Sequence, residues 1–212
     1  MLTKRPTLLL PSLLLAFSAA MALLSPGFFE VDELSHFLKA REMLHNYSQL
    51  LDIWGRPACT GLFGLAIALG NTLHQPLIAA RLLAVLLTAL TSLGTVSLYK
   101  SLTPYLPIPN TPHFSRHANP WLWILLYAQP LFLLNSFTVM TEMLLAASWV
   151  WAATLLLKSK PKSAALLLGL GGLARPEGWF AIAAFPLFLL LCQFLLNKKR
   201  PPLTTLLLLA LA

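Results

Sequence analysis

The sequence predicts an all-α fold, a polytopic bundle of transmembrane helices with an outward-facing first loop that contains amphipathic surface helices. Hydrophobic residues make up 58% of the 212 residues and charged residues only 10%, whereas about a quarter of an ordinary soluble chain is charged. Several apolar runs approach the roughly 18 residues that cross about 30 Å of hydrocarbon as a helix. The runs are rich in Leu and Ala and lack the alternation of membrane strands. We therefore expect a single-domain (1–212) integral membrane protein.

The first apolar run, at about 7–25, follows Lys4 and Arg5. A cleaved signal peptide has the same basic flank and apolar core, but it is usually shorter. We expect an uncleaved first span with a cytoplasmic N-terminus, and an outer loop over 27–75 that begins after the helix breakers Pro26 and Gly27.

This outer loop carries most of the acidic residues of the chain. Five of the seven lie between positions 30 and 56, namely Glu30, Asp32, Glu33, Glu42 and Asp52. Residues 31–47 have a helical period, with apolar side chains near one side and polar ones near the other. The apolar set is Val31, Leu34, Phe37, Leu38, Leu44 and Tyr47, and the polar set is Asp32, Ser35, His36 and Lys39. This pattern predicts a short helix that lies on the membrane surface.

Five further spans are expected, at about 76–99, 120–139, 141–157, 163–175 and 179–196. Another apolar run, 58–74, is interrupted by Gly61, Gly64 and Gly70 and is only marginally long enough to cross. The chain stops at Ala212, inside an apolar run that starts near Leu203 and is too short to span. We therefore expect the N-terminal part of a longer protein.

The distribution of basic residues predicts the topology, because cytoplasmic loops of membrane proteins are enriched in Lys and Arg. If 58–74 does not cross, ten basic residues and no acidic residue lie inside. Five basic residues and all seven acids then lie outside. The inside set is Lys4, Arg5, Lys100, Arg116, Lys158, Lys160, Lys162, Lys198, Lys199 and Arg200, and the outside set is Lys39, Arg41, Arg56, Arg81 and Arg175. A crossing 58–74 would place the Lys158 and Lys198 clusters on the face opposite Lys4 and Arg5, so we expect it not to cross.

Charge and cysteine content exclude several classes of function. The net charge is +8, but nucleic-acid binding needs a solvated basic face, and in a membrane protein basic residues mainly report topology. Cys59 and Cys192 are far apart in apolar surroundings, and we expect two free thiols. Asp32 and His36 are too few ligands for a metal site. No cofactor is expected, although a divalent metal stays open.

The topology gathers three polar elements at the outer ends of spans, namely Asp32-Glu33, Thr141-Glu142 and Arg175-Pro176-Glu177. These residues could instead have ordinary structural roles. Glu142 could cap a helix, and Arg175 could reach the headgroups or pair with Glu177. Arg56 and Arg81 have the same alternative, and Glu42, Asp52, His36 and His45 are expected at ordinary surface or core positions. Taken together, guanidinium groups that bind phosphate and a carboxylate that can act as a base suggest a site for an anionic lipid headgroup.

The order of these features resembles the membrane-embedded C-type (GT-C) glycosyltransferases. The relevant branch holds the dolichyl-phosphate-mannose protein mannosyltransferases and the bacterial lipid-A aminoarabinose and Rgt-type transferases. The resemblance covers most of the chain. Its marks, after the first span, are DELSHFLKARE from Asp32, RLLAVLLTALTSL from Arg81, FTVMTEMLLAA around Glu142, and GLGGLARPEGW around Arg175. Where the family often has a His-Pro-Pro pattern, this chain has Trp54-Gly55-Arg56-Pro57.

The resemblance implies an inverting transfer of a sugar from a polyprenyl-phosphate donor to an acceptor hydroxyl on the periplasmic or other extracytoplasmic face. Asp32 would be the catalytic base and Glu33 its motif partner. Glu142 would be the second carboxylate region, and Arg175 would contact the donor phosphate. The full set that we expect to bind substrate or the donor phosphate also includes Arg56, Arg81 and Glu177, from the charge argument above. The expected partners are this lipid donor, a glycan, lipid or protein acceptor, and membrane lipids, and the expected location is a bacterial inner membrane. Two alternatives remain open: a transporter or flippase-like binder of a lipid-linked substrate, and a non-catalytic membrane remnant.

Overall fold

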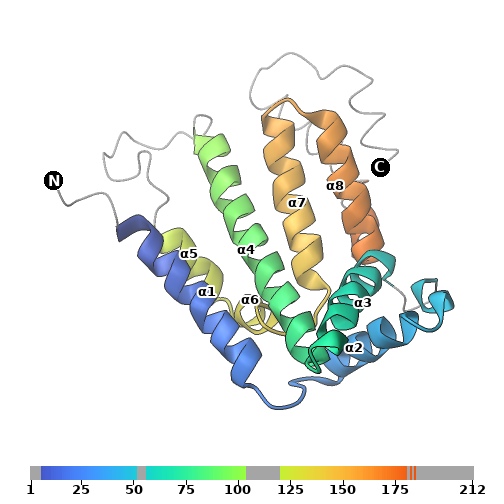
Figure 1. Cartoon of the computed structure of the whole chain (residues 1–212). Coiled ribbons are helices and arrows are strands. Elements are labelled where there is room, and N and C mark those ends of the chain that lie inside the picture. The colour runs from blue at the N-terminus through green and yellow to red at the C-terminus, as the bar shows by residue number, and fades with distance from the viewer. Residues whose placement is uncertain (1–5, 52–55, 104–119, 181, 183, 185–212) are drawn as a thin grey trace.

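The structure is a computed structural model that describes residues 6–51, 56–103, 120–180, 182 and 184 (Figure 1). Every regular element in these ranges is a helix, as the composition predicts. The elements are α1 (Pro6–Leu24), α2 (Val31–Met43), the 3₁₀ turn η1 (Tyr47–Leu50), α3 (Pro57–Thr72), α4 (Pro76–Leu102), α5 (Pro120–Ala128), α6 (Pro130–Asn135), α7 (Glu142–Leu157) and α8 (Pro161–Ala174). The expected span at 179–196 lies almost wholly outside the described residues.

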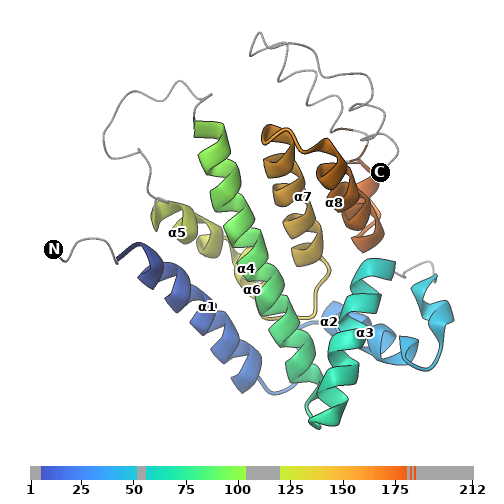
Figure 2. The same cartoon turned by 45° about the horizontal axis from the view of Figure 1, so that its top comes forward.

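The long helices α1, α4, α7 and α8 run side by side, with α2 and α3 across one end of the bundle (Figures 1 and 2). α4 is central, because it packs against α1, α3, α5 and α7, and α7 in turn packs against α8. Glycines permit this close packing. A Cβ at Gly94 of α4 would collide with the Val150 side chain of α7, and one at Gly171 of α8 would crowd the Trp149 ring.

One end of the bundle collects the segments that the sequence analysis places outside. α1 and α8 finish at the lower end in Figure 1, where α4 and α7 begin. We call it the site end. All six acidic residues of the described part belong to segments at this end: Glu30, Asp32, Glu33, Glu42, Glu142 and Glu177. The opposite end has Lys100, at the end of α4, and the turn between α7 and α8 with Lys158, Lys160 and Lys162.

Helix α3 has both of its termini at the site end. At its start, the Arg56 guanidinium donates a hydrogen bond to the Thr141 hydroxyl, next to the start of α7. At its other end, Gly70 lies against Pro76 and Ala79 in the first turn of α4. α3 therefore does not run the length of the bundle, and the non-crossing arrangement of 58–74 stays a prediction.

The apolar run at 120–139, expected as one span, is divided in the structure. Pro130 disfavours helical backbone in the preceding residue, and Gln129 is extended, so α5 and α6 are separate helices. After α6, residues 136–141 are non-helical and buried. This buried segment, which we call the 136–141 connection, leads into Glu142 and α7.

Helix α2 forms where the sequence predicts a surface helix, but its faces differ from the expected two. Glu33, Phe37, Ala40 and Met43 face the protein. Most of the predicted apolar side points away from it, since Val31 is 78% and Leu38 48% exposed. The polar side lines a cleft, so α2 has a protein-facing, an outward apolar and a polar face.

Among the described helices, α4 (27 residues) is long and apolar enough to cross a membrane. α7 and α8 and the apolar part of α1 from Leu9 are apolar but shorter. Membrane association is therefore supported by one helix, and the multi-pass arrangement stays a prediction.

Candidate functional site

A cleft of about 360 Å³ opens at the site end between α2 and the start of α3. It is lined by Asp32, Ser35, His36, Lys39 and Arg56. The first four residues stand at i, i+3, i+4 and i+7 of α2, which places them along one side of the helix. Asp32 is exposed at the first turn. The polar side of the predicted amphipathic helix is therefore the floor of this cleft.

Arg56 joins the cleft to the start of α7. Its Nη1 donates to His36 Nε2 at 3.0 Å and to the Thr141 hydroxyl. Because arginine can only donate, His36 must accept through Nε2 and carry its proton on Nδ1. Burial, and next the nearby Arg56 charge, lower the pKa of His36 to about 4. Both acceptors are therefore uncharged at neutral pH, and neither neutralises the guanidinium.

Arg175 lies at the end of α8 and pairs with two carboxylates. It donates to both oxygens of Glu177 at 3.0 Å and forms an ion pair with Glu142. The hydrogen bonds from Arg175 are the main reason why the pKa of Glu177 falls to about 2. The other Glu142 oxygen, Oε2, is buried without a hydrogen-bond partner among the described residues. An acceptor for a hydroxyl group is therefore left over in this cluster.

The two polar clusters belong to one electrostatic site. Burial and then the positive charge of Arg175 lower the pKa of Arg56, while Glu177 and Asp32 act in the opposite direction. Two neighbouring guanidinium groups repel each other, and an anion placed between them would relieve this repulsion. The arrangement is thus suited to an anionic group, with a carboxylate beside it.

Glu33 and Arg81 are paired elsewhere, in the interior. Arg81 Nε donates to Glu33 Oε1 at 2.9 Å and Nη2 to Oε2 at 3.1 Å, and both side chains are buried. Arg81 also donates to the carbonyls of Ser25 and Gly27. The Glu33 carboxylate and the Arg81 guanidinium already have hydrogen-bond partners, so they do not act in the cleft that holds Asp32.

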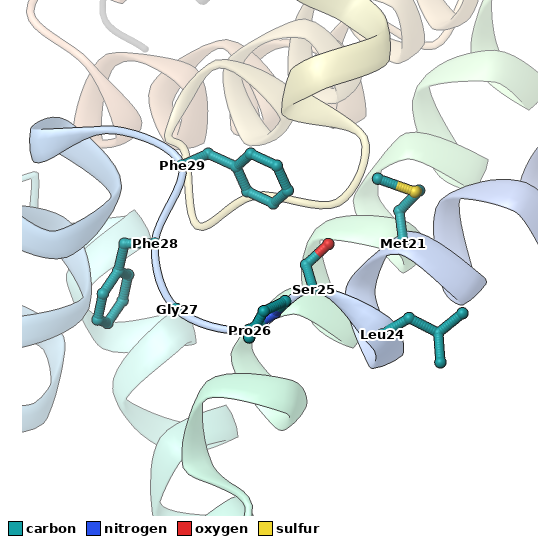
Figure 3. Close-up of a pocket in the computed structure, with 7 residues that line it drawn as sticks. All are labelled: Met21, Leu24, Ser25, Pro26, Gly27, Phe28 and Phe29. Atoms are coloured by element: carbon teal, nitrogen blue, oxygen red, sulfur yellow. The ribbon is translucent and has the colours of Figure 1, made fainter.

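A second cavity, also about 360 Å³, lies at the turn between α1 and α2 (Figure 3). Its lining is Met21, Leu24, Ser25, Pro26, Gly27, Phe28 and Phe29. Phe28 and Phe29 extend to opposite sides of the chain in Figure 3. This cavity has no ionisable side chain in its lining, whereas the Asp32 cleft has four.

The structure brings together five of the seven residues proposed from the sequence, namely Asp32, Arg56, Glu142, Arg175 and Glu177. It also adds His36 and Lys39, which sequence reasoning did not propose for the site. Their spacing from Asp32, four and seven residues, is the signal that could have found them. Among the described residues, no group of three or more His, Cys, Asp or Glu side chains could hold a metal ion.

Comparisons of the chain with protein-family models, with curated proteins and with solved structures found no match.

Proposed function

We propose that this chain is a multi-pass membrane glycosyltransferase of the C type. It transfers a sugar, with inversion, from a polyprenyl-phosphate donor to an acceptor hydroxyl at the outer face. The observation that carries the proposal is the position of an exposed carboxylate, Asp32, in one cleft with Arg56. The order of motifs along the chain supports it, because Asp32 opens the first of the motifs that mark the resemblance to that family.

Asp32 and Arg56 supply the two functions that the transfer needs. The Asp32 carboxylate takes the proton from the acceptor hydroxyl, whose oxygen forms the new bond to the anomeric carbon from the side opposite the leaving group. The bond between this carbon and the phosphate oxygen breaks, and the lipid phosphate leaves with the electron pair. Arg56, whose hydrogen-bond acceptors His36 and Thr141 are uncharged, stabilises the negative charge of the leaving phosphate.

Glu142, Arg175 and Glu177 complete the site as a substrate-binding group. Arg175 contributes positive charge beside Arg56, and it is already balanced by two carboxylates. The unpartnered Oε2 of Glu142 can accept a hydrogen bond from a sugar or acceptor hydroxyl. The roles proposed for the seven residues therefore divide among the cleft, the neighbouring Arg175 cluster and the buried Glu33–Arg81 pair.

Charge and the geometry of the bundle support a membrane placement. We propose that the site end faces the periplasm or another extracytoplasmic space and that the lysine-bearing end faces the cytoplasm. The exposed Val31, Leu34 and Leu38 of α2 then lie on the lipid surface, with the cleft at the level of the headgroups. A donor phosphate at this level would be within the reach of Arg56 while its hydrocarbon chain stays in the bilayer.

The proposal is tested by Asp32→Asn in the purified protein. We expect sugar transfer from a panel of radiolabelled polyprenyl-phosphate sugars to fall by about 10²–10⁴-fold, the usual range for loss of a general base. Binding of the donor lipid should persist. Glu30→Gln, an exposed carboxylate two residues earlier, is the matched control and should keep full transfer.

Undiminished transfer by Asp32→Asn would remove Asp32 from its role as the base. If the wild-type protein binds donors in the panel and moves them across vesicles without cleaving them, a transport function replaces the proposal.

A further inference from the structure

The buried Glu33–Arg81 ion pair connects three separate parts of the chain. Arg81 is in the second turn of α4 and donates to the Ser25 and Gly27 carbonyls at the turn after α1. Glu33 in α2 accepts from the Phe29 N–H at 2.8 Å. It also accepts from the Val139 N–H at 3.2 Å, in the 136–141 connection. The pair therefore satisfies backbone groups that helices cannot satisfy themselves.

Ring contacts support the same junction. The Arg81 guanidinium lies 5.4 Å from the centroid of the Phe29 ring, and Phe29 packs on Phe137 with centroids 5.2 Å apart. On the other side of the turn, Phe28 packs on Phe37 of α2 at 5.4 Å. The turn between α1 and α2 is thereby held on both sides.

Two of the segments that carry candidate site groups, α2 and the start of α7, begin at this junction. Asp32 directly precedes Glu33, and Thr141 and Glu142 follow Val139 by two and three residues. Because the Glu33 carboxylate binds both Phe29 and Val139, its position sets the distance between the start of α2 and the start of α7.

We propose that Arg81 and Glu33 are positioning residues: together they hold Asp32 in register with the Thr141–Glu142 end of the 136–141 connection. The inference rests on the proposed function only for the role of Asp32. A planar guanidinium fork uses four donor contacts here, two to Glu33 and two to carbonyls. Lysine would keep the charge but not the fork, so it cannot hold all three segments.

The chain has a built-in reporter of this register. The Cys59 thiol of α3 is 1% exposed and donates to the Thr141 carbonyl at 3.7 Å. With Cys192 replaced by serine, Cys59 is the single thiol of the chain. Its rate of reaction with a water-soluble maleimide then measures how tightly the 136–141 connection covers it.

The experiment compares Arg81→Lys with its parent in the Cys192→Ser protein, purified as the folded, monodisperse fraction. A second reporter, Ala152→Cys in a Cys59→Ala, Cys192→Ser background, monitors the separate α7–α8 core, where Ala152 is fully buried. We expect Arg81→Lys to raise Cys59 labelling at least about tenfold and to leave the Ala152→Cys reporter unchanged. Arg41→Lys, the same change at an exposed position of α2, should alter neither rate.

Unchanged Cys59 labelling in Arg81→Lys would overturn the proposal. Equal acceleration of both reporters would also overturn it, because it would show general destabilisation. In a transfer assay, Arg81→Lys should lower kcat by about tenfold or more with KM for the donor lipid unchanged, whereas a purely structural role would scale activity with the folded fraction. Selective Cys59 labelling with no transfer by any variant would reject the proposed function and leave the positioning role standing.

Discussion

Adjacent residues in Asp32-Glu33 have opposite environments, although their side chains differ by one methylene group. Asp32 is exposed on the cleft side of α2, while Glu33 is fully buried and paired with Arg81. Successive residues of a helix point about 100° apart, so one can face solvent and the next the core. A buried charge is stable only with a partner, and removal of one partner of such a pair costs about 3–5 kcal/mol. This cost explains why Arg81 and Glu33 satisfy each other's hydrogen bonds so completely.

His36 makes stability depend on pH in a defined window. Its folded-state pKa of about 4 is below the ordinary value of 6.5, so the unfolded chain takes up this proton first as the pH falls. The His36 contribution to stability is therefore intact above about pH 6.5 and is lost progressively down to about pH 4. We expect the thermal unfolding midpoint of His36→Gln, in which this position does not titrate, to depend less on pH in this window than that of the wild-type protein.

The matched control is His45→Gln, an exposed histidine just beyond α2. It should leave the pH profile of the unfolding midpoint parallel to that of the wild-type protein. If His36→Gln and wild type lose stability in parallel between pH 6.5 and 4, His36 is not the group responsible.

Two helix ends, those of α3 and α7, share one unusual feature. His74 and Ser159 have positive φ values of 55° and 58°, a left-handed conformation that costs residues other than glycine free energy. Each ends its helix with the paired bonds of a Schellman motif. At the end of α3, the Gln75 N–H donates to the Gly70 carbonyl and the His74 N–H to the Asn71 carbonyl. At the end of α7, the Lys160 N–H donates to the Leu155 carbonyl and the Ser159 N–H to the Leu156 carbonyl. The turns that reverse the chain at the two ends of the bundle therefore hold local strain.

Glycine at these positions should relieve the strain. We expect His74→Gly and Ser159→Gly each to raise the free energy of unfolding by about 0.5–1 kcal/mol, after the greater entropy of glycine in the unfolded chain is subtracted. Chemical denaturation in detergent measures this change. Ser163→Gly, inside the first turn of α8, is the opposite control and should destabilise by about the same amount. A loss of stability in both cap variants would contradict the strain assignment.

At the scale of the whole bundle, the described acidic residues lie in segments at the site end, while Lys100, Lys158, Lys160 and Lys162 lie at the opposite end. α3 has both termini at the acidic site end, and the lysines of the α7–α8 turn lie at the other. A bundle placed in a bilayer with this polarity follows the positive-inside rule. We therefore predict that α3 stays on the outer side, although its apolar composition would permit a crossing.

Thiol labelling in cells tests this topology. In a background without Cys59 and Cys192, Leu65→Cys on the exposed side of α3 should be blocked by a membrane-impermeant reagent added from outside. Lys162→Cys, at the opposite end, should react only when the cytoplasmic face is opened, for example in inverted vesicles. Labelling of Leu65→Cys from the cytoplasmic face would overturn the non-crossing arrangement.

The helical class, most helix positions and five members of the candidate site could be predicted from the chain alone. The sequence itself shows the apolar runs, the proline and glycine breaks, and the uneven distribution of lysine and arginine. Each of these signals depends only on residues close together or on their order along the chain. The run 120–139, predicted as one span, is the main error: Pro130 is present in the sequence, but only the structure shows the break and the buried connection that reaches Glu33 through Val139.

The Arg175–Glu177 pair, two residues apart, was visible in the sequence, but the distant partners of Arg81 and Arg56 were decided by the tertiary structure. Arg81 is 48 residues from Glu33, and Arg56 is 85 residues from Thr141. No local pattern specifies such pairs, because the energy of a buried ion pair depends on burial and distance, which exist only after the helices have packed. Asp32 and Glu33 therefore look alike in the sequence, and packing alone places one in the cleft and the other in the core.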